Sequence, residues 1–173
     1  MRAAIFTEGS MTTSESAGSY SDHFEGSFLS VNTLADDLSD YSDTEIHVLS
    51  ETYGYVEGED VVEPEPIVDQ TKSIERFEDF LLSQVGELDV VVLLFTTDVF
   101  KHILTPNWET IVEQAKPDSI WCIGTSRSAL NSVDLELLES QHPVLIYERR
   151  GVARVGTETR EELIDRIRAR SNE

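Results

Sequence analysis

Residues 90–95 form an unbroken apolar run with the sequence Val-Val-Val-Leu-Leu-Phe. A strand that faces solvent on one side alternates apolar and polar residues, whereas a strand covered on both faces does not. The run therefore predicts a central strand over residues 89–95 of a parallel sheet, with helices packed on both of its faces. The run is also far shorter than the ~20 apolar residues that a membrane-spanning helix requires.

Four shorter apolar runs predict further strands, at residues 3–6, 46–49, 119–123 and 144–147. Between the strands, apolar side chains recur three or four residues apart, which is the spacing of one helix face. These helical segments lie at residues 22–38, 71–85, 97–104, 108–115, 133–138 and from 157 onward. Alternation of strands and helices indicates parallel strands joined by right-handed crossovers. We therefore predict an α/β fold: a doubly wound, mainly parallel five-stranded sheet with helices on both faces, flavodoxin-like or Rossmann-like, in a single domain over residues 1–173.

Two segments are predicted to be irregular. Residues 9–21 are rich in Ser, Thr and Gly, a composition typical of mobile chain. Residues 57–68 are acidic and contain two prolines, which cannot donate to a sheet, so they predict an acidic loop. Val152 and Val155 predict a small hairpin at the sheet edge.

The chain is strongly acidic, with 34 Asp and Glu against 13 Lys and Arg and a formal net charge of −21. A small soluble domain needs a net charge of only about 2–8. With a larger excess, the acidic groups repel one another and destabilise the compact state unless salt screens their charges. At 1 M salt the screening length falls to about 3 Å. We therefore predict a protein folded in a salt-rich cytoplasm, as in a halophilic archaeon. Glu8, Glu15 and Asp22 interrupt any N-terminal hydrophobic segment, so no signal peptide is expected.

The charge is unevenly distributed along the chain. Residues 1–100 carry 22 acidic residues against 3 basic ones, whereas residues 101–173 carry 12 against 10. Seven of the ten arginines lie between Arg149 and Arg170. One interpretation is a solvated C-terminal helix with paired charges, and the other is a local positive face for a phosphate or an acidic partner.

The predicted topology also locates a binding site, because open parallel sheets bind ligands at the carboxyl ends of their strands. The best anion-binding candidate there is the segment 124–128, Gly-Thr-Ser-Arg-Ser, where a small residue allows close approach and Arg127 offers a bidentate contact. A plain turn from strand to helix explains the same residues. Together with the segment after the second strand, the predicted ligand-binding residues are Ser50, Tyr53, Gly124, Thr125, Ser126 and Arg127.

Other chemistry-bearing residues have structural interpretations. Thr96-Thr97-Asp98 is either a helix cap or a site for a base or a metal carboxylate. The four histidines show no metal-binding spacing, so no metal site is predicted, and His47 lies inside a strand. Cys122 lies in a predicted buried strand, where it behaves as a small hydrophobic residue. The sequence identifies no catalytic residue and no cofactor.

Residues 46–64, IHVLSETYGYVEGEDVVEP, resemble a segment of the family of small α/β domains related to the peroxide-stress proteins. In that segment a strand ends in Leu-Ser, followed by a Tyr-Gly pair and an acid-Pro turn, which here are Leu49-Ser50, Tyr53-Gly54 and Glu63-Pro64. The family's first strand usually ends in a Ser-Cys-Gly-Lys-like loop, where this chain has Thr7-Glu8-Gly9-Ser10 and no lysine. The resemblance implies the fold; some family members are linked to DNA binding and oxidative stress.

Two functional hypotheses follow. In the first, the protein is a cytoplasmic domain that binds a nucleotide or another phosphate-bearing small molecule at the carboxyl ends of the strands. In the second, it is a non-catalytic interaction module that docks a protein partner through the Arg-rich C-terminal helix or the acidic loop. A net charge of −21 argues against a nucleic-acid partner, because nucleic acid repels an acidic surface.

Overall fold

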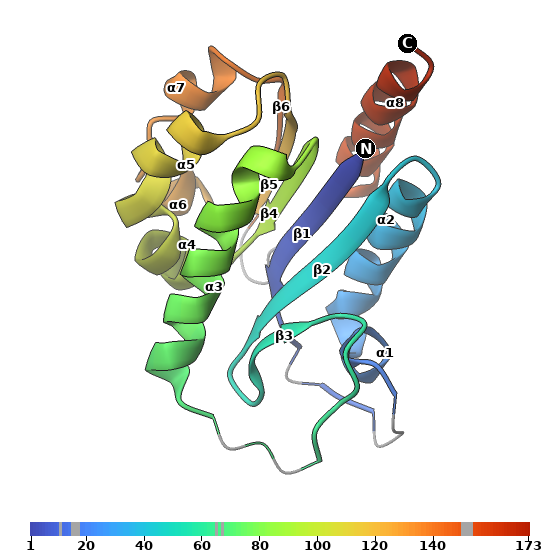
Figure 1. The fold of residues 1–173 in the computed structure, drawn as a ribbon, viewed down its shortest axis with the longest axis vertical. Helices are drawn as coiled ribbons and strands as arrows, with labels where there is room; N and C mark the ends of the chain where they lie inside the picture. Colours follow the sequence, from blue (N-terminus) through green and yellow to red (C-terminus); the bar gives the residue numbers. More distant parts are fainter. Residues whose placement is uncertain (11, 15–17, 65, 67, 150–153) are drawn as a thin grey trace.

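The protein folds around one six-stranded sheet, seen in Figure 1. The computed structural model describes residues 1–10, 12–14, 18–64, 66, 68–149 and 154–173. The strand order is β3-β2-β1-β4-β5-β6, and every neighbouring pair is parallel except β2 with β3. The strands are β1 (Arg2–Glu8), β2 (Asp43–Ser50), β3 (Gly54–Glu57), β4 (Val90–Leu94), β5 (Ile120–Thr125) and β6 (Val144–Glu148).

Strand β4 occupies the position that its apolar run predicts. It pairs in parallel with β1 on one side and β5 on the other, and all five of its residues are buried. Val90, Val92 and Leu94 pack into the core on one face of the sheet, whereas Val91 and Leu93 pack into the core on the opposite face. The expectation of a central strand covered on both sides is therefore confirmed.

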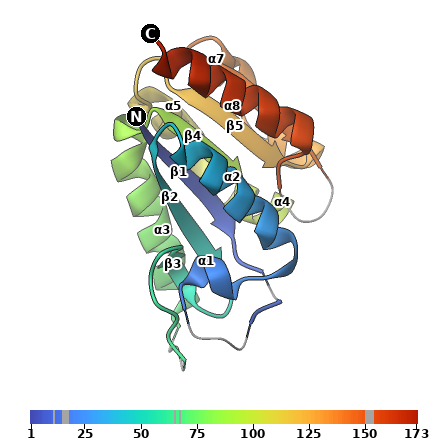
Figure 2. The same cartoon turned by 90° about the vertical axis from the view of Figure 1, so that its right-hand side faces the viewer.

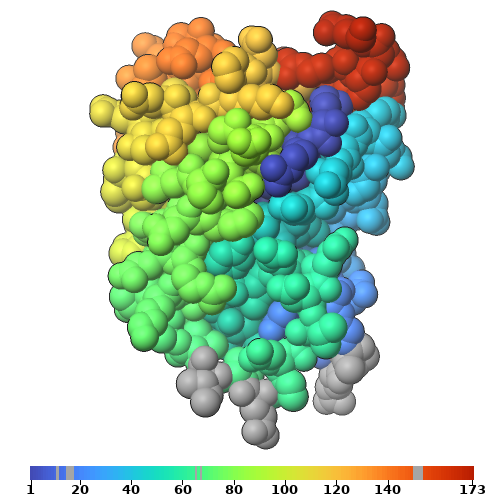
Figure 3. All heavy atoms as spheres, in the orientation of Figure 1, coloured from blue at the N-terminus to red at the C-terminus, as the bar shows by residue number. Residues whose placement is uncertain are grey.

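Helices cover both faces of the sheet, as Figures 1 and 2 show. One face carries α1 (Tyr20–His23), α2 (Leu29–Ser39) and α8 (Thr157–Ser171). The other carries α3 (Gln70–Gln84), α4 (Thr97–Ile103), α5 (Trp108–Gln114), α6 (Arg127–Leu130) and α7 (Leu135–Glu139). The space-filling view in Figure 3 shows green and yellow segments, which include α3 and α5, spread over the second face. No helix in the described part of the chain is long and apolar enough to span a membrane.

The predicted number of five strands is wrong, because β3 adds a sixth. It forms a hairpin with β2 in which Ser50 pairs with Gly54 and His47 pairs with Glu57. Gly54 has a φ of +71°, a conformation that glycine adopts without steric cost, and this starts the return strand. The acidic loop consequently begins one residue later than predicted, because Glu57 belongs to the strand.

The first predicted helix, over 22–38, is interrupted. Helix α1 ends at His23, a single 3₁₀ turn covers Gly26–Phe28, and α2 begins at Leu29. Gly26 has a φ of +65°, which an α-helix cannot accommodate, so the break follows from that residue.

The structure bears only partly on the predicted irregular segments. Within 9–21, the Gly9 N–H donates to Leu49 O at 3.1 Å, so the described part has fixed contacts, and mobility of the segment stays a prediction. Of the predicted edge hairpin, Val152 lies outside the described residues, and Val155 belongs to no strand. Two further 3₁₀ turns follow α3 and α4, at Val85–Glu87 and Thr105–Asn107.

Candidate functional site

The five parallel strands all end at one edge of the sheet, which we call the carboxyl edge. The crossover direction changes between β1 and β4, so these two strands flank the switch point where doubly wound folds bind ligands. The segments that follow the strands at this edge contain the candidate functional residues.

Glu8, the last residue of β1, occupies the switch point. Its carboxylate accepts hydrogen bonds from the Thr96 backbone N–H at 2.6 Å and from Thr96 Oγ1 at 3.0 Å. Burial raises the pKa of Glu8, because the desolvation cost outweighs these two hydrogen bonds. Thr96 is the N-cap residue of α4, but its hydroxyl donates to Glu8 rather than capping the helix. The switch point is therefore occupied by an acid of the protein itself.

Arg154 lies beside Glu8 and is only 2% exposed. Its Nε donates to the Ser27 carbonyl at 3.1 Å, and its Nη1 donates to Thr7 Oγ1 at 3.3 Å. The guanidinium also lies 5.6 Å from the centre of the Phe28 ring. Burial lowers the pKa of Arg154 to about 10, and the charge of Glu8 opposes that shift. The side chain thus ties the segment before α8 to the end of β1.

Sequence reasoning missed both Glu8 and Arg154 as site residues. No spacing in the sequence links residue 154 to residue 7, since their contact depends on the strand order. The sequence did contain one signal. Arg154 stands among small apolar residues, in Val-Ala-Arg-Val, which offer a solvent-exposed arginine no adjacent acid to pair with.

Ser50 and Tyr53 form the turn between β2 and β3. Ser50 Oγ accepts from the backbone N–H groups of Thr52 at 3.2 Å and Tyr53 at 3.1 Å, and the residue is buried. The Tyr53 hydroxyl lies 2.8 Å from Nε2 of His23, which is 8% exposed. Ser50 therefore stabilises the turn. The Tyr53 ring lines a cavity beside α3, which is described in the last Results subsection.

Gly124 and Thr125 are buried at the end of β5. The Thr125 hydroxyl donates to the Phe95 carbonyl at 2.7 Å, which joins the ends of β4 and β5. A Cβ atom on Gly124 would lie 2.8 Å from the Arg154 carbonyl oxygen and 2.8 Å from Leu94 Cδ2. Both residues are therefore structural: they hold the end of β5 close to the end of β4 and to the Arg154 backbone.

The variant Gly124→Ala is expected to lose about 1–3 kcal/mol of unfolding free energy, the usual cost of overpacking, because the Arg154 backbone must move. Urea unfolding at constant KCl measures this loss. Gly18→Ala is the matched control, since no atom of the described residues lies within 4 Å of its added Cβ. A Gly124→Ala protein as stable as the wild type would show that the close backbone approach does not exist.

Ser126 and Arg127 border an open cavity of about 550 Å³ that we call the carboxyl-edge cavity. Ser126 Oγ caps α6 by accepting from the Ala129 N–H, and it lies 2.5 Å from Thr97 Oγ1. The Arg127 side chain is 77% exposed, and its Nε donates to Glu148 Oε1 at 3.1 Å. The cavity is lined by Thr97, Ser126, Arg127, Ser128, Glu148 and Arg149.

A third cation borders this region. Lys101 Nζ donates to the Ser128 hydroxyl at 2.8 Å, so the lysine reaches from α4 to a lining residue of the carboxyl-edge cavity. Lys101, Arg127 and Arg149 thus gather at one corner of a protein whose net charge is −21.

The six predicted site residues do not surround one cavity. Ser50 and Tyr53 lie at and after the end of β2, whereas the other four lie at or after the end of β5. Strands β1 and β4 lie between them, which puts the two groups about 14 Å apart across three strand spacings. The structure therefore brings Ser126 and Arg127 together with Arg149 and separates them from Ser50 and Tyr53.

The arginines of α8 are paired with other groups of the protein. Arg166 contacts Glu162 at 2.8 Å, Arg168 contacts Asp165 at 3.0 Å, and Arg160 contacts Asp37 at 3.4 Å. Arg170 donates to the Asp118 carbonyl. This agrees with the interpretation of a solvated helix with paired charges.

Two other residues singled out from the sequence, His47 and Cys122, lie in the core. His47 is fully buried, with Nδ1 2.8 Å from the Tyr55 hydroxyl and Nε2 3.1 Å from Glu45, and burial lowers its pKa. Cys122 is buried in β5, where burial raises the pKa of its thiol to about 12. Within the described ranges, no three His, Cys, Asp or Glu residues are grouped so that they could hold a metal ion.

Comparison of the chain with protein-family models and with curated proteins found no match in either.

Proposed function

We propose that the protein binds a small phosphate-bearing ligand, such as a nucleotide, in the carboxyl-edge cavity. One observation carries the proposal. Arg127 and Arg149 line one cavity together with the hydroxyl groups of Thr97, Ser126 and Ser128, and Lys101 donates to the Ser128 hydroxyl, in a chain that has only 13 cations against 34 acids. Cations and hydroxyl donors are the groups that bind phosphate oxygens.

The pairing of Arg127 with Glu148 is compatible with an incoming phosphate. Both side chains are exposed, and exposed ion pairs contribute only about 0–1 kcal/mol. A phosphate can therefore replace the Glu148 carboxylate on the guanidinium at little cost, and it accepts two parallel hydrogen bonds from Arg127.

The position within the fold supports the same ligand class. The five parallel strands follow the order β2-β1-β4-β5-β6, which is that of flavodoxin-like folds, whose ligands bind at the carboxyl edge. At the switch point itself the Glu8 carboxylate repels an anion, so the phosphate is expected to shift along the edge to the cations after β5 and β6.

The charge of the chain supports a salt-rich cytoplasm as the working environment, with the acidic surface screened there. The resemblance of residues 46–64 to the peroxide-stress-related family is consistent with the fold, but those residues run from β2 through β3 into the loop that follows, and none of them lines the carboxyl-edge cavity. The proposed function therefore depends on the residues after β5 and β6.

Calorimetric titration with AMP and with inorganic phosphate in 2 M KCl tests the proposal. Because hydrogen bonds to charged groups contribute about 1.5–3 kcal/mol, Arg127→Ala is expected to weaken AMP binding at least tenfold. Arg166→Ala, on α8, is the matched control and is expected to bind AMP like the wild type. Equal affinities of the wild type and Arg127→Ala, or no binding of either probe, would exclude the carboxyl-edge cavity as the site.

A further inference from the structure

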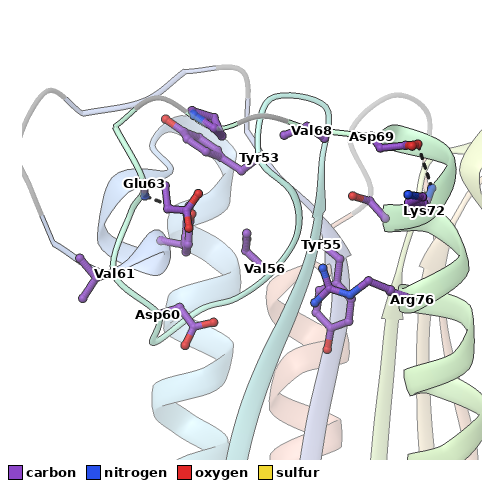
Figure 4. A pocket seen from close by; sticks show the side chains of 13 residues that line it. Tyr53, Tyr55, Val56, Asp60, Val61, Glu63, Val68, Asp69, Lys72 and Arg76 are labelled. Atoms are coloured by element: carbon purple, nitrogen blue, oxygen red, sulfur yellow. Dashed lines mark hydrogen bonds between the residues drawn. The ribbon is translucent and has the colours of Figure 1, made fainter.

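We infer that a second cavity binds a short peptide, or a zwitterion of that size, with its ammonium and carboxylate ends on opposite walls. This cavity, of about 620 Å³, lies between α3, β3 and the loop that follows β3, as Figure 4 shows. We call it the dipolar cavity. It shares no lining residue with the carboxyl-edge cavity.

One wall of the dipolar cavity, formed by α3, carries two cations and one acid, Asp69, whose carboxylate accepts a hydrogen bond from the Lys72 backbone N–H at 3.2 Å. Lys72 and Arg76 are one turn apart on α3, and both line the cavity. They are two of only three cations among residues 1–100, where there are 22 acids. Even so, within the described part of the chain neither forms an ion pair. The Arg76 guanidinium lies 5.5 Å from the centre of the Tyr55 ring, which holds it at the cavity.

The opposite wall is acidic. Asp60 and Glu63 lie on the loop after β3, across the cavity from α3 in Figure 4. Two hydrogen bonds to Tyr20 fix this loop. The Glu63 N–H donates to the Tyr20 hydroxyl at 3.2 Å, and the Tyr20 N–H donates to the Asp60 carbonyl at 3.0 Å. The two walls of opposite charge are therefore held by the fold.

Aromatic rings line the cavity on the acidic side. The centres of the Tyr20 and Tyr53 rings are 5.2 Å apart, with the planes inclined by 63°. The hydrogen bond between the Tyr53 hydroxyl and Nε2 of buried His23 keeps the Tyr53 ring in place. Aromatic faces attract ammonium groups and pack against apolar side chains, so they complement the acids on the same wall.

The arrangement selects a ligand with two opposite charges. Its ammonium group fits beside Asp60, Glu63 and the tyrosine rings, and its carboxylate fits beside Lys72 and Arg76. A cavity of this volume lies in the range of about 300–1,000 Å³ that is typical of pockets for drug-sized ligands. A peptide of two or three residues with free termini has both the charges and the size.

Titration of the wild type with the tripeptide Ala-Phe-Ala, followed by amide chemical shifts in 2 M KCl, tests this inference. We expect binding of the free tripeptide, and at least threefold weaker binding of both its N-acetyl and its C-amide derivatives. The variant Lys72→Gln is expected to bind the free tripeptide with at least threefold lower affinity than the wild type and to bind the C-amide with the same affinity as the wild type. Arg166→Gln, outside the cavity, is the matched control and is expected to change neither affinity.

The variant Arg76→Gln tests the second cation of the α3 wall. Its urea unfolding midpoint shows whether a loss of peptide binding is accompanied by a loss of stability from the missing contact with Tyr55. No binding of the tripeptide, equal affinity for the three peptides, or an unchanged affinity of Lys72→Gln would overturn the inference. These outcomes are independent of AMP binding, because the two cavities have no residue in common.

Discussion

Transfer of the protein from 3 M to 0.2 M KCl is expected to unfold it at 25 °C. The compact state confines a net charge of −21, and exposed charges interact over roughly 10 Å at 0.1 M salt but only about 3 Å at 1 M. The fluorescence of Trp108 and Trp121 reports this transition, because both indoles are at most 3% exposed in the folded protein.

A comparison with sucrose identifies the cause. Sucrose at matched osmolality is excluded from the protein surface but does not screen charge, so it is expected to restore the fold only in part. A protein whose unfolding free energy is equal at 0.2 and 3 M KCl would contradict the view that its surface needs screening.

The variant Arg154→Ala is expected to lose about 3–6 kcal/mol of unfolding free energy, since hydrogen bonds to a charged group contribute about 1.5–3 kcal/mol each and at least the two to Ser27 and Thr7 are removed. Removal of the guanidinium also leaves the partly buried Glu8 carboxylate without the neighbouring positive charge. Urea unfolding at constant 2 M KCl gives the magnitude, and Arg166→Ala, whose side chain is exposed, provides the matched control.

The double variant Glu8→Gln with Arg154→Met sharpens this test. Replacing both charges removes the uncompensated carboxylate and keeps most of the buried volume, so it is expected to recover part of the lost stability. An Arg154→Ala protein within 0.5 kcal/mol of the wild type, about the size of an ordinary surface change, would show that Arg154 does not tie the segment before α8 to β1.

The sequence predicted the central part of the sheet because burial on both faces leaves a direct trace in residue type. Val90–Leu94 has no polar residue, and its neighbours β1 and β5 contain the short apolar runs at residues 3–6 and 120–123. Strand β3 left no such trace. It has four residues, begins with a glycine, and obtains its stability from pairing with β2 rather than from its own apolar pattern.

For the candidate site, the sequence predicted the edge of the sheet at which the residues lie but not which residues meet there. Parallel strands require their carboxyl ends to share an edge, so Ser126 and Arg127 were correctly placed at that edge. Which segments meet there depends on strand order, which the residues of single strands do not encode. The insertion of β1 and β4 between β2 and β5 therefore separated Ser50 from Gly124, and the contact of Arg154 with Thr7 could not be foreseen.

The most direct test of the proposed binding site is a map of backbone amide shifts in 2 M KCl as AMP is added. We predict that the shifted amides cluster around Thr97, Ser126, Arg127, Ser128 and Arg149. Shifts confined to the dipolar cavity around Tyr53, Lys72 and Arg76, or spread evenly over the surface, would contradict phosphate binding at the carboxyl edge.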